Sequence, residues 1–230
     1  MKRTILAAFL IMAVASIANT NEIYVEQVGD GLDLDITQDG TDNVAGTSEA
    51  PMVFNGDDMT FDIDQVGDNN VIAATINGNT YSGTISLTGN NNNVDLACDS
   101  VGSVTCETVT VDVTVNGNGA DIDLRIGETQ DASNLVATFT VDGDSNVIDA
   151  EVDGTNADAT VIIDNASSLA GGNTVNIDMD GDGDVNGNSI NLDITGGGGV
   201  YNVTQSGIND NTVVGTFEGD DQTVDIIQSD

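Results

Sequence analysis

Carboxylates are the side chains through which this sequence could do chemistry. The 230 residues include 39 Asp and Glu against 3 Lys and Arg, with no His, and the formal net charge is −36. Pairs such as Asp33/Asp35 and Asp62/Asp64 have the residue types of a glycosidase or lyase acid/base pair. Such a pair needs a cleft and an environment that raises one pKa, and the sequence has no imidazole to shuttle protons. We therefore expect that this protein is not an enzyme.

One acidic stretch, 178–189, matches the first half of a calcium loop. Its candidate oxygen ligands alternate with other residues around a glycine: Asp178, Asp180, Asp182 and Asp184. The twelfth position holds Ser189, where such a loop has Glu. The alternative is a solvated acidic turn. Calcium is thus the one candidate cofactor, and specific binding stays open.

The N-terminus has the pattern of a secretory signal peptide. Lys2 and Arg3 precede the apolar run 5–14 and a small-residue segment that ends at Ala18. A membrane anchor is the alternative, but the run is shorter than the roughly 20 apolar residues of a spanning helix. We expect a signal peptide at 1–18, one mature domain at 19–230 without a membrane span, and a secreted, extracellular or cell-surface location.

Charge and cysteines agree with that location. After cleavage Arg125 would be the last fixed positive charge, so a phosphate backbone would be repelled and nucleic acid is excluded as a partner. Cys98 and Cys106 enclose seven residues that interrupt the strand pattern around them. Secretion favours a local disulfide between them. Free thiols or metal ligation are the alternatives.

Short amphipathic strands ending at glycine must position all these residues. Gly recurs at eleven-residue steps, as at Gly56, Gly67 and Gly78. Most residues at every second position before such a glycine are apolar. The residues between them are mostly Asp and Thr, as in 109–117. Thr110 and Thr114 in that strand suggest an ice-binding face, with a generic outward face as the alternative.

Eleven residues hold one strand and one turn but no helix. We therefore predict an all-β fold: a β-solenoid with about two short strands per coil, cross-β stacking, and loops inserted at corners near 44–52, 128–134 and 166–173. A β-sandwich of hairpins is the competitor, but it predicts no common phase between strands.

One stretch of the sequence resembles a known family. Residues 38–45 read Q-x-G-x-x-N-x-A, and 65–70 repeat the first part of that pattern. This resembles the curlin repeat of secreted curli subunits, which fold as thin β-solenoids and stack end to end into extracellular amyloid fibres. The resemblance covers about 23–79 and 201–230. Between these ranges only the spacing of the repeat is similar.

Carried over position by position, the resemblance implies interior amide ladders. Their members would be Gln27, Gln38, Gln65, Gln205 and Gln228, with Asn43 and Asn70. The alternative is that polar solenoid turns simply favour Gln and Asn. The Ser that usually opens a curlin repeat is missing, and the acidity is high for the family.

The resemblance implies a structural fibre subunit that supports adhesion or biofilm formation through self-assembly. The rival hypothesis is a monomeric, calcium-dependent surface adhesin or binding module. We expect exposed edges at 21–40 and 201–228, where Val203 and Gln205 would be targets for blocking elongation. Assembly should accelerate with salt, calcium or mild acid, since stacked Asp side chains repel.

Overall fold

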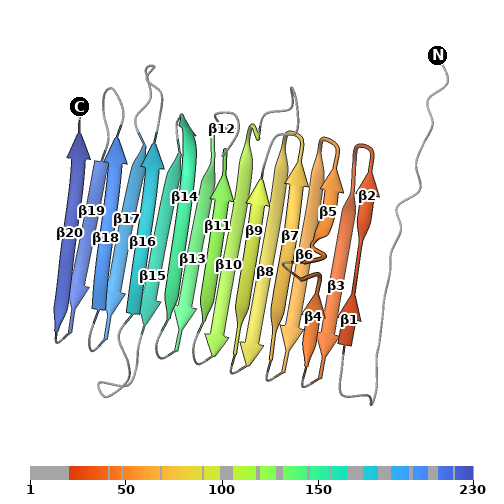
Figure 1. The fold of residues 1–230 in the computed structure, drawn as a ribbon, viewed down its shortest axis with the longest axis horizontal. Coiled ribbons are helices and arrows are strands. Elements are labelled where there is room, and N and C mark those ends of the chain that lie inside the picture. Colours follow the sequence, from red (N-terminus) through yellow and green to blue (C-terminus); the bar gives the residue numbers. More distant parts are fainter. Residues whose placement is uncertain are drawn as a thin grey trace.

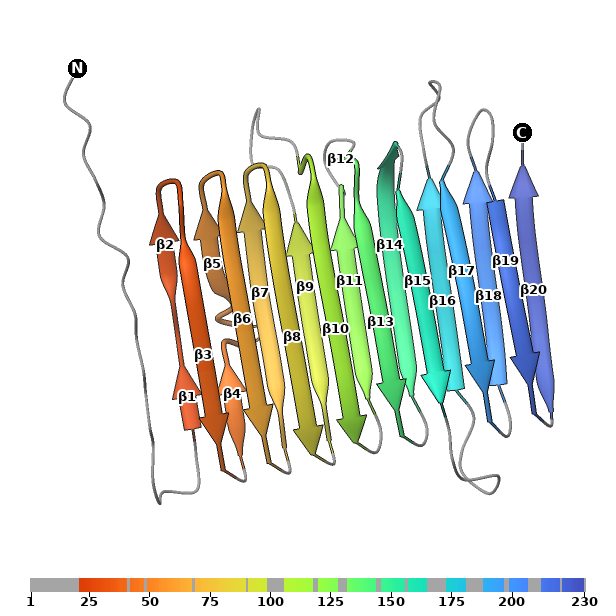
Figure 2. The ribbon, with the colours of Figure 1, turned by 180° about the vertical axis from the view of Figure 1, so that it is seen from behind.

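Parallel strands stacked in two facing sheets make up the fold. The computed structural model describes residues 21–229 except 41, 48, 68, 90, 99–105, 118–119, 128–131, 144–145, 156, 165–172, 181–187, 197–198, 207–211 and 220. Within these residues there are strands and turns and no helix. The chain passes back and forth between the two sheets and forms a β-solenoid (Figures 1 and 2), so the predicted fold class is confirmed.

The first sheet, the long sheet, contains twelve strands. They are β1 (Asn21–Ile23), β2 (Glu26–Val28), β4 (Asn43–Ala45), β5 (Met52–Asn55), β7 (Val71–Asn77), β9 (Asn93–Cys98), β11 (Asp121–Ile126), β12 (Ala132–Ser133), β14 (Val147–Thr155), β16 (Asn173–Asp180), β18 (Gly199–Ser206) and β20 (Gln222–Ser229). Strands β4 and β5 both pair with β7, so together they fill one level of the stack. In the same way β1 and β2 fill the level before them.

The second sheet, the short sheet, has eight strands. They are β3 (Asp33–Asp39), β6 (Met59–Val66), β8 (Tyr81–Gly89), β10 (Val109–Gly117), β13 (Val136–Asp142), β15 (Asp158–Asp164), β17 (Ser189–Thr195) and β19 (Thr212–Glu218). The core lies between the two sheets. Along β6 and β10 every second side chain is buried, which is the alternation that the sequence predicts.

The number of residues per coil varies while the strand register is kept. The corner residues Asn70 and Asn92 are 22 residues apart, whereas Ala157 and Asn188 are 31 apart at the opposite corner. The extra residues lie in connections between strands, outside the ladders. Each level therefore has to match only its two neighbours.

One predicted corner loop is in fact an insertion within a level. Val44 and Ala45 in β4 pair with Val71 and Ile72, and Met52 in β5 pairs with Ala74 of the same strand. The segment 46–51 therefore leaves and re-enters one strand position, and Ala73 lies opposite the excursion. The prediction of a corner was wrong because length alone cannot distinguish a corner loop from a bulge. Most of 128–134 and 166–173 lies outside the described residues.

The recurring glycines owe their position to close stacking at the corners. A Cβ on Gly67 would collide with the carbonyl oxygen of Gly40, and one on Gly89 with that of Gly67. Gly67 also has φ of 154°, a conformation that L side chains rarely adopt. The eleven-residue glycine pattern thus marks the places where successive corners touch.

Candidate assembly surfaces

Three asparagines form a buried ladder at one corner of the solenoid. Nδ2 of Asn70 donates to Oδ1 of Asn43 at 2.9 Å, and Nδ2 of Asn92 donates to Oδ1 of Asn70 at 2.7 Å. All three side chains are buried. The ladder stops at the next level, where Ala120 follows Asn92, and Oδ1 of Asn92 has no hydrogen-bond partner among the described residues.

The glutamines are divided between the two sheets. Gln38 and Gln65 are buried neighbours in the short sheet, and Nε2 of Gln65 donates to Oε1 of Gln38 at 2.5 Å. Gln205 and Gln228 are paired in the long sheet at the C-terminal end. Gln27, at the N-terminal end of the long sheet, is paired with Phe54 instead of another amide.

Sequence reasoning missed part of the asparagine row. Asn92 belongs to the hydrogen-bonded ladder, and Asn146 and Asn173 continue the row beyond Ala120. The signal was present, because each of these asparagines directly precedes or begins an apolar strand. It was not used because no Q-x-G motif accompanies them.

The C-terminal end of the solenoid is an open edge. Strand β20 pairs with β18 on one side, and no other strand of the described chain pairs with it. Val224 and Ile226 are 41% and 43% exposed, although their partners one level earlier, Tyr201 and Val203, are buried. The row of core side chains therefore becomes solvent-exposed at β20.

Part of the backbone of β20 points away from β18, toward the open side of the strand. The N–H of Gly199 donates to the carbonyl of Asp221 at 3.5 Å. Because bonding direction alternates along a parallel ladder, the N–H and C=O groups of Val224 and Ile226 face the open side. The inward-facing residues of β20 are thus the ones whose backbone can receive another strand.

The structure corrects the predicted extent of the C-terminal edge. Val203 and Gln205 lie in β18, which is hydrogen-bonded to β16 and to β20, and both side chains are buried. Substituting them would damage the last coil instead of blocking elongation. The prediction failed because Gln205 and Gln228 share a motif, which does not tell which strand is terminal.

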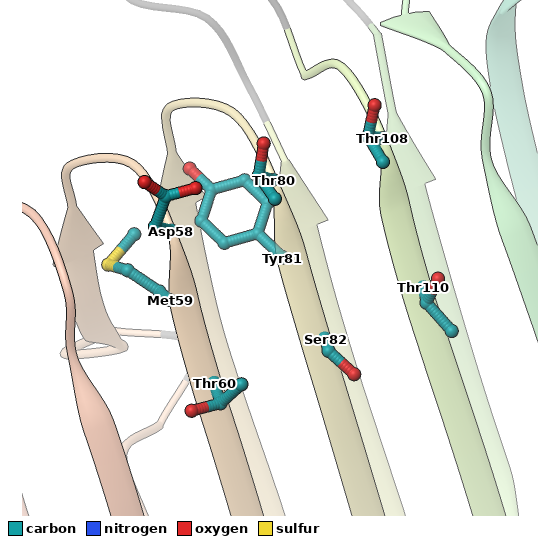
Figure 3. Close-up of a pocket in the computed structure, with 8 residues that line it drawn as sticks. All are labelled: Asp58, Met59, Thr60, Thr80, Tyr81, Ser82, Thr108 and Thr110. Atoms are coloured by element: carbon teal, nitrogen blue, oxygen red, sulfur yellow. The ribbon is translucent and has the colours of Figure 1, made fainter.

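An open hollow of about 390 Å³ lies where β6, β8 and β10 begin (Figure 3). It is lined by Asp58, Met59, Thr60, Thr80, Tyr81, Ser82, Thr108 and Thr110. The Tyr81 hydroxyl donates a hydrogen bond to the carbonyl of Gly56 at 3.3 Å. Burial is the larger cause that raises the Tyr81 pKa, and the nearby Asp57 carboxylate raises it further. The phenol stays protonated at neutral pH and can donate a hydrogen bond in the hollow.

The outward faces carry rows of aspartate. In the long sheet Asp95, Asp123 and Asp149 are aligned on successive levels. Nη2 of Arg125 lies 2.6 Å from Oδ1 of Asp95, and its Nε lies 3.3 Å from Oδ1 of Asp123. Burial raises the Asp123 pKa, Arg125 opposes that rise, and the neighbouring aspartates add to it. In the short sheet, Thr110 and Thr114 lie beside Ser82 and Ser86 on β8.

Mild acid should stabilise the fold. The Asp62 pKa is raised by partial burial and then by the Asp64 and Asp35 carboxylates, so the folded chain binds more protons than the unfolded chain between the ordinary and the raised pKa. Stability must then fall as pH rises through this window. At constant ionic strength we expect a higher urea midpoint at about pH 4.5 than at about pH 7.

A matched pair of variants tests this explanation of the pH effect. Asp62→Asn should reduce the difference between the two midpoints. Asp193→Asn should leave it unchanged, because the neighbours of Asp193 on the adjacent strands are Ile162 and Thr216. Equal pH dependence in both variants would contradict the proposed repulsion between aligned carboxylates.

Other predicted features are only partly described. Cys98 and Cys106 form a disulfide, and both residues are buried. Asp178 lies on the outward face of β16, whereas Asp182 and Asp184 lie outside the described residues, as does the predicted signal peptide. Among the described residues no three potential metal-ligating side chains come together, so calcium binding stays a prediction.

The chain matches no protein-family model, no curated protein and no solved structure. The part of the chain that the structure describes contains no helix of the length and apolarity needed to cross a membrane.

Proposed function

We propose that this chain is a secreted structural subunit that adds end to end into a curli-like extracellular fibre or matrix, supporting adhesion or biofilm formation. The observation that carries the proposal is the open edge at β20. Its apolar side chains are exposed on the core side and its backbone groups face outward from the ladder. Such an edge can bind an added strand through main-chain hydrogen bonds.

The composition of the end strands supports this role. Edge strands of soluble proteins are usually protected by Lys, Pro or inward-pointing charges. Strands β1, β2, β3 and β20 contain neither Lys nor Pro, and their inward positions are apolar or amide side chains. These end strands therefore lack the usual protection against pairing with another chain, which supports the proposal.

The charge distribution supports growth along the axis. The outward rows of both sheets carry aspartates such as Asp35, Asp62 and Asp149, and the net charge is −36. Like charge on the sides keeps rods apart laterally, whereas the core-facing rows at the ends are uncharged. The same rows serve as solvated surface, in keeping with a structural rather than a catalytic role.

Electron microscopy and thioflavin fluorescence of the purified mature protein test the proposal. We expect fibres whose growth accelerates with NaCl, because a few tenths molar salt shortens the Debye length to about 5 Å. A steeper response to CaCl₂ at equal ionic strength would indicate bridging of neighbouring carboxylates. Soluble monomers under all of these conditions would reject the fibre and favour the calcium-dependent binding module.

A further inference from the structure

The two sheets of the solenoid differ by one level. The path through the long sheet runs over nine levels, from β1 to β20, whereas the short sheet has eight, from β3 to β19. The chain alternates between the sheets, so the first and the last of the described strands, β1 and β20, both lie in the long sheet. Among the described strands none therefore faces β20 across the core, which explains the exposure of Val224 and Ile226.

Because the long sheet has one level more than the short sheet, the orientation of a second copy decides whether it can continue both sheets without a gap. After β20 the alternation requires the next strand on the side of the short sheet, above β19. A copy stacked without rotation would instead place its β1 and β2 on β20 and leave an empty level opposite them. A copy turned by half a revolution about the rod axis places β1 and β2 on β19 and fills that level.

The two sheets are similar enough for such an exchange. Gln27 and Gln38 occupy matching places, each two residues before a corner glycine, Gly29 and Gly40. Two stacked aromatic pairs also show that equivalent positions in the two sheets can be exchanged. Near the N-terminal end Phe54 of the long sheet stacks on Phe61 of the short sheet. Near the C-terminal end Phe217 of the short sheet takes the place of Phe54, and Tyr201 that of Phe61.

We propose that successive copies of this chain join head to tail with a rotation of about half a turn, a refinement that rests on the proposed function. β20 of one copy then pairs in parallel with β3 of the next, and β19 pairs with β1 and β2. The contact joins two different surfaces and does not close on itself, which is the geometry that produces an open fibre.

The register of this junction matches the core row of β20. Aligning the glutamines places Gln228 on Gln38, where it extends the bonded pair of Gln38 and Gln65. The same register places Ile226 on Ile36 and Val224 on Leu34. On the other sheet it places Val213 on Ile23. There it also places Gln27 on Phe217, an aromatic neighbour like the Phe54 that Gln27 already has within the chain. Every inward position of β20 from 224 to 228 thereby meets a residue of its own chemical kind.

The junction also brings two like charges together. Asp225 of one copy comes to lie beside Asp35 of the next, about 4.8 Å away along the axis. The repulsion between these two carboxylates opposes the junction. It is an outward, solvent-facing pair, so salt or a divalent cation relieves it, in agreement with the salt dependence expected for growth.

Cysteine pairing across the junction tests the rotation. Ile227, Thr37 and Glu26 are exposed and face outward. In a half-turn junction Ile227 lies beside Thr37 of the next copy, whereas in an unrotated stack it lies beside Glu26. Adjacent strands are close enough for a disulfide, and the native cysteine pair is buried.

The experiment oxidises two mixed fibres and compares dimers on non-reducing gels. We expect strong dimers when Ile227→Cys is mixed with Thr37→Cys, and at most about one-tenth as much when it is mixed with Glu26→Cys. Cryo-electron microscopy gives a second readout. The half-turn predicts a fibre repeat of about 80 Å, two subunits, where an unrotated stack repeats at about 40 Å.

The outcomes separate this inference from the proposed function. Fibres that crosslink through Glu26, or through neither site, overturn the half-turn and leave the fibre proposal standing. A protein that forms no fibres under any salt condition overturns both. Fibres that crosslink through Thr37 and show the doubled repeat support both.

Discussion

Replacing Ile226 with Lys is expected to slow fibre elongation at least about 100-fold while the chain still folds. Ile226 is 43% exposed in the free chain, so the ammonium reaches water there, but an added copy would bury it in the core row. Burying an unpaired charge costs several kcal/mol, and each 1.4 kcal/mol corresponds to about a tenfold change in rate. Seeded growth followed by thioflavin fluorescence measures the effect.

The neighbouring position supplies the matched control. Ile227 is 55% exposed and belongs to the outward face of β20, so Ile227→Lys introduces the same charge on the same strand without burying it at a junction. We expect its elongation rate to stay within about threefold of the wild type. Circular dichroism establishes that both variants are folded. Normal growth of Ile226→Lys would show that β20 is not the growing edge.

Replacing Asn70 with Ala is expected to lower the free energy of unfolding by about 2–5 kcal/mol. The change leaves Oδ1 of Asn43 and Nδ2 of Asn92 without partners in a buried row, and each unsatisfied buried group costs roughly 1–3 kcal/mol. Urea denaturation followed by circular dichroism measures the loss.

The adjacent residue again provides a control. Asn69 makes an analogous ladder on the solvent side, donating to Asp42 at 2.9 Å and accepting from Asn91 at 2.8 Å. Water can replace these partners, so Asn69→Ala should cost less than about 1 kcal/mol. Equal losses in the two variants would mean that burial of the ladder contributes nothing to its strength.

Alternation of side chains made the fold predictable from the sequence. One register places Val109, Val111, Val113 and Val115 on the same side of β10, and all four are buried. The glycine step located the corners for a reason that only the structure reveals, the contact of Gly67 with Gly40. Local pattern was sufficient because each level of a solenoid contacts only its neighbours.

Features that depend on counting levels could not be predicted. The segment 46–51 has the composition of a corner loop, yet it interrupts a strand between Ala45 and Met52. Gln27 carries the same motif as Gln38, but the level after it presents Phe54. Which residue meets which depends on every connection length before it, so a single uncertain loop displaces the predicted neighbours.

The asparagine row contains a native break at Ala120, and within the described chain hydrogen bonds compensate for it on the side of Asn146 but not at Oδ1 of Asn92. At Ala120 the row loses an amide, but the backbone N–H of Ala120 donates to Oδ1 of Asn146 at 3.3 Å. Nδ2 of Asn146 turns to the carbonyl of Gly143 at 2.7 Å. The side chain after the break is therefore satisfied by backbone groups.

The direction of the inter-strand hydrogen bonds has a mechanical consequence for a fibre of the proposed kind. These bonds run along the rod, and within one chain the covalent backbone also links each level to the next. Between copies that covalent link is missing, so shear or sonication should break fibres at the junctions. Each fragment would then contain whole subunits and carry the same two ends as its parent. Breakage would multiply growing tips without creating a new kind of surface.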